Sequence, residues 1–366
     1  MIPLYKPYLT GKEKEYVIAC IDSTWISSKG EFIGIFESAF ANYIGANRAT
    51  SVCNGTVALH LALEALGLGV GDEVIVPTFT YIASVNTIVQ TGATPVFVDS
   101  DPSNWQLDIP DVRRKITPRT KAVMAVHLYG FPCDMDQLVG LCQEHQLFLI
   151  EDCAEAFGSY YKGRHVGTFG DIATFSFFGN KTITTGEGGM VVSNNARLMD
   201  RAFHLKTQGV SPDQEYWHDI AGYNYRMTNL CAAIGQAQLE SADFIIEKKR
   251  TIATWYNQKL DGLSLQMLED TTDTRQSYWL CSLLTEDRST RDLLRAYLKT
   301  AGVETRPFFH PAHTMPMFAN KERFPVAESL AQRGINLPSF PDLSQSEVAY
   351  ICKLIHDFFA CNINVA

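Results

Sequence analysis

The sequence predicts an α/β protein: a large region with a mainly parallel, mixed sheet between helices, followed by a smaller α+β region. Short apolar, β-prone runs alternate with helical patterns over the first half of the chain, which is typical of a parallel sheet covered by helices. The length of 366 residues suggests two domains. A long amphipathic helical pattern begins near Asp243 and marks a second region. We therefore expect one domain at 1–242 and a second at 243–366.

The expected elements follow from apolar periodicity and turn residues. In the large region we expect strands at 50–53, 73–77, 95–99, 121–127, 147–153 and 174–178, an apolar run at 190–192, and helices at 12–22, 32–43, 55–66, 82–91 and 135–145. In the second region we expect helices at 244–260 and 288–301, and strands at 277–284 and 303–309. Ser344 and Glu347 form a capping box that opens the last helix, which is expected to run to about Phe359.

Composition and charge exclude several classes of function. The chain is 46% hydrophobic and carries a net charge of −9, which argues against nucleic acid and anionic membranes as primary partners. No apolar run reaches transmembrane length, and the first residues do not form a signal peptide. The nine cysteines are scattered without a CxxC pair, which is typical of reduced thiols and predicts a cytoplasmic protein.

One lysine stands out between two apolar runs. Lys181 follows Gly179 and Asn180, and the residues after it, 182–189, are almost all small and polar. A loop lysine ordinarily extends its amine to water. A glycine-rich turn, however, lets the backbone approach a ligand closely, and a desolvated lysine loses proton affinity and becomes a nucleophile. We therefore expect Lys181 to be a reactive amine.

Further polar residues lie at the ends of the expected strands. Tyr81, His127 and Asp152 each fall at or near a strand end, and residues 54–56 lie where a strand leads into a helix. A helix start can bind an anion through its free amides, although it can equally be an ordinary cap. Because ligands bind at the carboxyl edge of such sheets, we expect these groups to converge. The glycines at 67, 69 and 71 follow a helix and do not form a dinucleotide fingerprint.

Several motifs, in the same order along the whole chain, carry a resemblance to a known family. They lie at 51–56, 77–81, 151–158, 170–171, 176–181, 184–189, 222–227 and 337–341. The chain resembles the DegT/DnrJ/EryC1/StrS sugar aminotransferases, which are pyridoxal-phosphate (PLP) enzymes of fold-type I. It is most similar to members that convert GDP-4-keto-6-deoxy-D-mannose to GDP-perosamine, with L-glutamate as donor, for O-antigen lipopolysaccharide.

The resemblance implies catalytic roles for two residues. Lys181 would form a Schiff base with PLP and then move the proton between substrate and cofactor. Asp152, 29 residues earlier, would keep the pyridine nitrogen protonated. Tyr81 would stack on the ring, and Glu155 would approach the ring's 3-oxygen. Because many relatives have Gln or His at the position of Glu155, the residue that holds this proton stays open.

The remaining cofactor contacts implied by the resemblance concern the phosphate. Gly55 and Thr56 at the helix start, with the hydroxyl of Ser176, would bind it. Asn224 resembles a residue that reaches the phosphate of the neighbouring subunit. The resemblance therefore implies a homodimer with shared active sites.

The substrate contacts are expected in three places. Arg306, His310 and His313 lie in a motif near the sugar site of relatives, and Trp25 lies in a polar loop where it is either a packing anchor or a ligand contact. Arg226 or Arg306 could bind the donor carboxylate and the diphosphate in turn, or could pair with a surface acid. Pro311 and the lack of further ligands argue against a metal at His310 and His313.

Other functions remain as alternatives. The substrate could be a dTDP- or UDP-linked keto sugar. Relatives that have histidine in place of the lysine are dehydratases, so Lys181 favours transamination. A non-catalytic PLP-fold protein with a sensing role is disfavoured by the intact Lys181 and Asp152. A nicotinamide-dependent oxidoreductase is disfavoured by the missing fingerprint.

Overall fold

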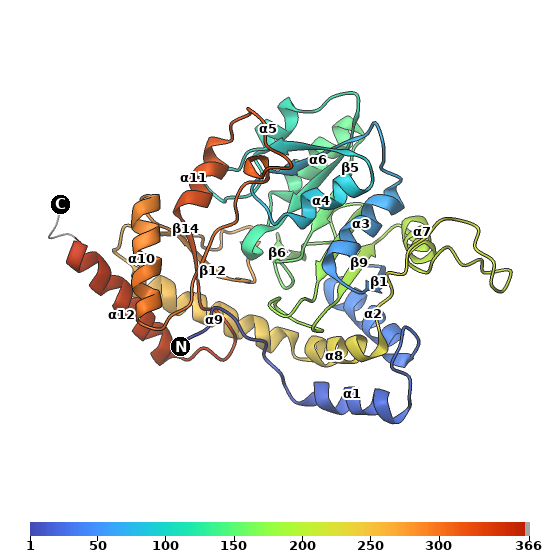
Figure 1. Cartoon of the computed structure of the whole chain (residues 1–366), viewed down its shortest axis with the longest axis horizontal. Helices are drawn as coiled ribbons and strands as arrows, with labels where there is room; N and C mark the ends of the chain where they lie inside the picture. Colours follow the sequence, from blue (N-terminus) through green and yellow to red (C-terminus); the bar gives the residue numbers. More distant parts are fainter. Residues whose placement is uncertain (363–366) are drawn as a thin grey trace.

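The computed structural model describes residues 1–362 and contains a seven-stranded sheet between two layers of helices (Figure 1). All neighbouring strands in it are parallel except at β9, which runs antiparallel to both β1 and β8. The prediction of an α/β fold with a mainly parallel sheet is therefore confirmed. The strands, in their order across the sheet, are β1 (Arg48–Val52), β9 (Gly189–Ser193), β8 (Ile172–Ser176), β5 (Phe148–Asp152), β4 (Thr120–Val126), β2 (Glu73–Pro77) and β3 (Thr94–Val98).

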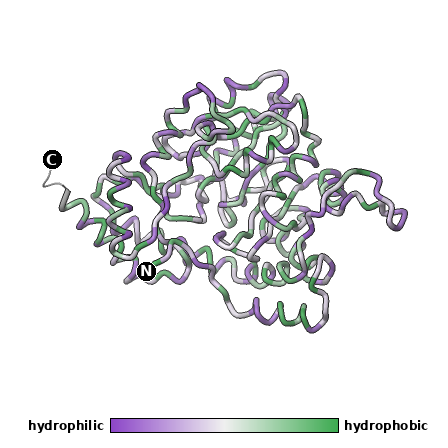
Figure 2. Tube along the Cα trace, in the orientation of Figure 1, coloured by the Kyte–Doolittle hydropathy of each residue, from purple (hydrophilic) through white to green (hydrophobic). Residues whose placement is uncertain are grey.

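Both faces of the central strands are buried, and each face has its own core. Along β4, Met124 and Val126 point to one core while Val123 and Ala125 point to the other, as the two-residue period of a strand requires. This explains why these strands appear in the sequence as continuous apolar runs. Figure 2 shows hydrophobic residues gathered along the middle of this region.

The helices divide between the two faces. One face is covered by α3 (Gly55–Leu66), α4 (Ala83–Gln90) and α7 (Ala196–Lys206). The other is covered by α2 (Glu31–Ile44), α5 (Ile109–Arg114), α6 (Met135–His145) and α8 (Asn229–Glu240), with α1 (Lys12–Asp22) packed on α8. Smaller elements here are η1 (Leu128–Gly130) and the short strands β6 (Tyr160–Tyr161), β7 (Arg164–His165) and β11 (Thr274–Arg275), which form a three-stranded sheet.

The C-terminal part contains an antiparallel sheet with a third core. Its strands, in order, are β10 (Gln266–Met267), β12 (Cys281–Leu284), β14 (Gly334–Leu337) and β13 (Arg306–Pro307). Its helices are α9 (Ala242–Leu260), α10 (Arg288–Thr300), η2 (Ala312–Thr314), α11 (Pro325–Arg333) and α12 (Gln345–Asn362). The start of the chain joins this part, because Ile2 bridges to Val303 and the amide of Leu4 donates to Glu304 Oε2 at 3.1 Å.

Two predicted strands are shorter than expected. The strand predicted at 277–284 begins only at Cys281, because Tyr278 has a φ of 50°, which is incompatible with extended backbone. The strand predicted at 303–309 is reduced to Arg306–Pro307, where the proline has no amide hydrogen to extend the ladder. The predicted capping box is confirmed: Ser344 N donates to Glu347 Oε2 at 2.8 Å, and Glu347 N donates to Ser344 Oγ at 3.2 Å.

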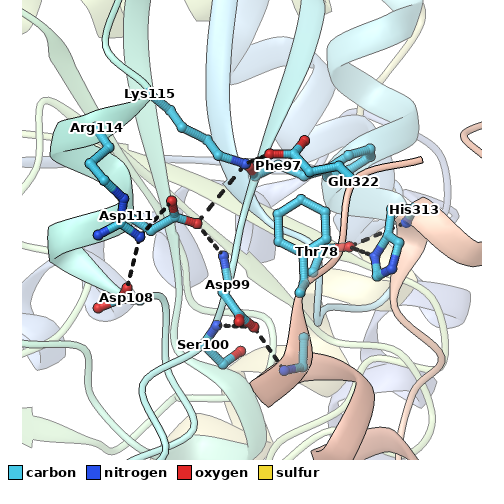
Figure 3. A network of polar contacts seen from close by, with 12 residues as sticks. Thr78, Phe97, Asp99, Ser100, Asp108, Asp111, Arg114, Lys115, His313 and Glu322 are labelled. Atoms are coloured by element: carbon cyan, nitrogen blue, oxygen red, sulfur yellow. Dashed lines mark hydrogen bonds and ion pairs between the residues drawn. The ribbon is translucent and has the colours of Figure 1, made fainter. Parts of the chain in front are cut away.

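A polar network fastens the segment around α11 to the edge of the large sheet (Figure 3). The carboxylate of Asp99 accepts hydrogen bonds from the amides of Val326 and Ala327 at the start of α11, at 3.2 and 2.8 Å. Lys115 reaches from the end of α5 to Glu322. Within residues 1–362, no helix has the combination of length and apolar character that crossing a lipid bilayer requires.

Candidate active site

Two adjoining cavities lie at the carboxyl ends of the parallel strands. The first has a volume of about 490 Å³, and Lys181, Asp152, Glu155, Ser176 and Tyr81 are among its lining residues. The second has a volume of about 670 Å³ and shares part of its wall with the first. The residues common to both walls are Thr80, Tyr81, Asn180, Trp279 and Phe309.

Lys181 lies in the loop that connects β8 to β9, and its amine is mostly buried. The Nζ atom is 3.8 Å from Glu155 Oε1 and 4.0 Å from the centre of the Trp279 ring. Burial lowers the pKa of Lys181, while the nearby carboxylates of Glu155 and Asp152 oppose this shift. The result is an amine that gives up its proton more readily than an ordinary lysine.

Asp152 is the last residue of β5, and its carboxylate is buried. Ser84 Oγ donates to Oδ2 at 2.8 Å, and the amide of Ala154 donates to Oδ1 at 3.0 Å. Burial raises the pKa of Asp152, although these two hydrogen bonds and Lys181 act in the opposite direction. A buried carboxylate of this kind is well suited to a cationic partner in the cavity.

Glu155 is fully enclosed between Lys181 and the backbone of η1. Its Oε2 atom accepts the amide hydrogen of Tyr129 at 2.8 Å. Burial raises the pKa of Glu155 to about 7, with Lys181 and the Tyr129 amide opposing. The side chain can therefore hold or release a proton near neutral pH.

The start of α3 forms the end of the cavity suited to an anion. Asn54 caps the helix, because its Oδ1 atom accepts the amide hydrogen of Val57 at 2.9 Å. The other amide hydrogens of the first helical turn point out of the helix end and can bind an anion. A Cβ atom at Gly55 would lie 2.7 Å from Ser176 Cβ, so only glycine lets the helix start approach the end of β8 this closely. Thr56 and Ser176 add hydroxyl groups to the cavity wall.

Aromatic rings form part of the cavity wall. The ring of Tyr81 is 56% exposed and its centroid is 5.6 Å from that of Phe309. The amide of Phe309 donates in turn to the hydroxyl of Tyr129 at 3.1 Å. A flat ring that is accessible from within a cavity provides a surface on which a planar ligand can stack.

The predicted substrate residues are only partly brought together. Arg306 and His310 line the second cavity, with Arg306 paired to Glu304 at 2.9 Å. Asn224 and Arg226 line neither of the two cavities; the guanidinium donates to Asn224 Oδ1 at 3.0 Å. Trp25, which is 55% exposed in the loop after α1, also lies outside both walls.

His313 does not line either cavity. Its Nδ1 lies 2.7 Å from Thr78 Oγ1, its Nε2 lies 3.4 Å from Glu328, and its ring packs on Phe324 (Figure 3 shows the contact with Thr78). The amide of Ala312 also donates to the carbonyl of Thr78, at 2.7 Å. His313 therefore fastens the segment that follows Phe309 and His310 to the end of β2.

His127 also turns away from the cavity, contrary to the expected convergence of strand-end groups. Its Nδ1 accepts the amide hydrogen of Cys133 at 3.0 Å, so Nε2 carries the proton and donates to Glu151 Oε2 at 3.1 Å. His127, Glu151 and Cys153 lie close enough together to hold a metal ion, but both imidazole nitrogens are already engaged. The Glu151 carboxylate accepts further hydrogen bonds from the amides of Gly167, Phe169 and Gly170.

Several residues at the site were not predicted. Ser84 binds the Asp152 carboxylate, and Trp279 and Phe309 close the cavity from the C-terminal part. The Oδ1 atom of Asn180 is buried and has no hydrogen-bond partner within residues 1–362, although the residue lines both cavities. No local pattern marks these residues, although the aromatic pair at 278–279 next to Ser277 was a weak indication of a packed site.

These residues fit PLP. The first cavity combines a mostly buried amine, a buried carboxylate that forms no ion pair within residues 1–362, an exposed ring and a helix start for the phosphate. Lys181, Asp152, Tyr81, Gly55, Thr56 and Ser176 would hold the cofactor. Asn224, the other predicted phosphate contact, lies outside both cavities.

Comparison with known proteins agrees with this geometry. The chain is similar to GDP-perosamine synthase of Escherichia coli O157:H7, with 60% identity over 360 residues that cover 98% of this chain and 99% of the relative. It is similar to GDP-perosamine synthase of Vibrio cholerae, with 55% identity over 366 residues that cover 99% of this chain and 100% of the relative.

Solved structures extend the likeness to the fold. The aminotransferase TlmJ from Streptoalloteichus hindustanus superposes with a TM-score of 0.95 at 31% identity, covering 99% of this chain and 100% of that one. The PLP form of a protein from Streptococcus pneumoniae assigned as a sugar aminotransferase gives a TM-score of 0.93 at 28% identity, covering 98% of each chain. The family model for the DegT/DnrJ/EryC1/StrS aminotransferases matches residues 7–356, and the chain belongs to this family.

Proposed function

We propose that the chain transfers an amino group from L-glutamate to C4 of GDP-4-keto-6-deoxy-D-mannose, using PLP, and thereby makes GDP-perosamine. The observation that carries the reaction class is the amine of Lys181, which faces two buried carboxylates inside one cavity. The substrate is supported by the 60% and 55% identity to GDP-perosamine synthases over almost the whole chain.

Each side chain of the site has its own role in the proposed reaction. PLP, when bound, supplies an electron sink that allows an amino group to be exchanged for a carbonyl. Lys181 Nζ moves a proton between the reacting carbon atoms, and its lowered pKa makes the neutral amine accessible for this purpose. Asp152 stabilises a protonated ring nitrogen, with Ser84 holding the carboxylate in place.

The second cavity is the proposed place of the sugar nucleotide. A keto sugar has no α-carboxylate, so the pocket needs partners for hydroxyl and diphosphate groups. Arg306 and His310 lie in the wall of this cavity, and an arginine suits both a diphosphate and the donor's carboxylate. The Arg306–Glu304 pair would open on binding, since both side chains are accessible there.

We also include a homodimer in this proposal. The loop that follows α7 projects from the body of the molecule (Figure 1) and carries Tyr216, which is 96% exposed, and Trp217, which is 55% exposed. Large aromatic side chains in such a position are typical of a surface covered by a partner. Asn224 and Arg226 lie at the base of this loop, so a second copy could bring them to a neighbouring cavity.

The biological setting follows from the substrate. GDP-perosamine supplies the sugar for the O-antigen of lipopolysaccharide, and we place this amination in the cytoplasm. The negative charge of the chain agrees with this location, and so do the eight cysteines that the structure describes as free thiols.

The test is a competition between keto sugars. The enzyme, PLP and glutamate are incubated with equal amounts of GDP-, dTDP- and UDP-linked 4-keto-6-deoxy sugars, and the products are identified by mass spectrometry. We expect the GDP-linked amino sugar to form first, and no product with Lys181→Ala. Preference for a dTDP- or UDP-sugar would overturn the substrate while leaving the aminotransferase reaction intact.

A further inference from the structure

The loop that carries Lys181 is held at two consecutive carbonyl groups, one by the C-terminal part and one by the start of the chain. The indole Nε1–H of Trp279 donates to the carbonyl of Asn180 at 2.7 Å. The hydroxyl of Tyr5 donates to the carbonyl of Lys181 at 2.6 Å. These two donors come from residues 99 positions after and 176 positions before their acceptors, so both bonds depend on tertiary structure.

Trp279 also contacts the side chain of Lys181. The Nζ atom lies over the indole ring, 4.0 Å from its centre, and the tryptophan is only 4% exposed. A cation over a desolvated aromatic face is attracted to the ring and keeps a fixed position. The ring is itself stacked on Tyr129, with an angle of 7° between the planes and 6.2 Å between centroids.

The backbone around Trp279 leaves it little freedom. Tyr278 has a φ of 50°, which turns the chain just before the tryptophan. On the other side, Gly130 has a φ of 92°, and a Cβ atom there would lie 3.0 Å from the amide nitrogen of Trp279. A non-glycine residue with a positive φ costs free energy and persists only where the surrounding structure holds it, as at many functional sites. The glycine allows the backbone of residue 130 to approach Trp279 closely.

Tyr5 is also fixed by tertiary contacts, although it is only the fifth residue of the sequence. The carbonyl of Leu4 accepts the amide hydrogen of Ser339 at 3.3 Å. The buried amine of Lys249 lies 5.0 Å from the centre of the Tyr5 ring and donates to the carbonyl of Ser339 at 2.8 Å. The segment that contains Leu4 and Tyr5 is therefore fixed to the C-terminal part, next to the point where the Tyr5 hydroxyl binds the carbonyl of Lys181.

We infer that Trp279 and Tyr5 are positioning residues, which hold the backbone of Lys181 and aim its amine into the cavity. The inference deepens the proposed function, since it takes Lys181 as the amine that moves the proton. It assigns the two residues no contact with the reacting atoms. Instead, each contributes by fixing the one side chain that must reach both substrate and cofactor carbon atoms.

The first test removes one hydrogen bond at a time. Tyr5→Phe and Trp279→Phe each take away a donor and keep an aromatic ring, while Tyr350→Phe removes a phenol–carbonyl bond to Ala301 that is remote from the cavity and serves as the control. We expect kcat to fall about tenfold in the first two variants, with KM values within about twofold of wild type. Amide hydrogen exchange over residues 178–186 should rise in both and stay unchanged in the control.

The second test measures the lysine without any substrate. Acetylation of Lys181 in the full-length protein freed of PLP is followed against pH by peptide mass spectrometry. In Trp279→Leu the midpoint of acetylation should move about one pH unit lower, because the ammonium form of Lys181 loses its contact with the indole ring.

If Trp279→Leu does not fold, Tyr5→Phe alone decides the matter. Unchanged amide hydrogen exchange over residues 178–186 together with an unchanged kcat would then overturn the inference. Because exchange and acetylation need no sugar, they separate this inference from the substrate proposal.

Discussion

The Nζ atom of Lys181 and the Oε1 atom of Glu155 lie 3.8 Å apart in the first cavity, and burial drives their proton affinities toward each other. The pKa of the amine is lowered, and that of the carboxylate is raised to about 7. The pKa values of the two groups are therefore closer together than those of an ordinary lysine and an ordinary glutamate, and the protonation of one group affects that of the other. A proton can pass between them at a smaller cost in free energy than between two exposed groups of the same kinds.

The Glu155 carboxyl should make the stability of the PLP-free protein depend on pH. Its pKa rises from 4.5 in the unfolded chain to about 7 in the folded protein. The carboxyl therefore makes its full contribution to the free energy of unfolding below pH 4.5, and this contribution is lost as the pH rises through about 7. Relative to Glu155→Gln, wild type should lose up to about 3 kcal/mol of unfolding free energy between pH 5 and 7.5. Urea denaturation at several pH values measures this difference, and parallel curves for the two proteins would contradict it.

Replacing the lysine should abolish turnover without unfolding the chain. Lys181→Ala removes the amine that moves the proton, and we expect the rate to fall by about a thousandfold or more, with PLP still bound noncovalently. Product is measured by mass spectrometry, and bound PLP by absorbance after gel filtration. Lys206→Ala, which changes a buried lysine paired with Glu37 outside the cavity, is the control for the loss of a buried amine. Near-normal turnover by Lys181→Ala would refute the assignment.

Asp152→Asn should lose most activity while the fold survives. The amide is similar in size and can still accept a hydrogen bond, but it carries no charge to stabilise a protonated ring nitrogen. We expect kcat to fall about a hundredfold or more, whereas Ser84→Ala, which removes only one donor to the carboxylate, should have a smaller effect. Steady-state kinetics and thermal unfolding of both variants give the comparison. A kcat close to wild type in Asp152→Asn would make this carboxylate purely structural.

The proposed sharing of active sites between two subunits predicts complementation. Asn224 lies outside the cavities of its own chain, so Asn224→Ala should impair the site of the partner. Subunit exchange between Lys181→Ala and Asn224→Ala proteins should restore one intact site for each mixed dimer, and activity should rise to about a quarter of wild type if exchange is random and each site works independently. Sedimentation equilibrium of wild type provides the independent check, because a fully active monomer is incompatible with this prediction.

Much of the fold could be predicted because its signals are local. The strands that are buried on both faces appear as apolar runs, and the alternation of these runs with helical patterns indicates the parallel sheet. Lys181 and Asp152 stood out for the same reason, since each is an ionisable group next to such a run. The direction in which a strand-end side chain points is not local, which is why His127 was expected in the cavity but binds Glu151 instead.

The remainder of the site depends on contacts between distant parts of the chain. Trp279 and Phe309 reach the first cavity from the C-terminal part, and Tyr5 reaches the second cavity and the carbonyl of Lys181 from the start of the chain. No periodicity or spacing records such a contact. The late start of the predicted strand at 277–284 has the same origin, because the turn at Tyr278 is needed to bring Trp279 against Lys181 and Gly130.

The hydrogen bond from Tyr5 to Lys181 has a consequence for the order in which the protein can mature on the ribosome. Tyr5 is synthesised more than 300 residues before Ser339, which belongs to the segment that holds it. The nascent chain can therefore complete the seven-stranded sheet long before its lysine loop is fixed. The backbone of Lys181 would therefore reach its final geometry only after residue 339 has been synthesised and has folded against the start of the chain.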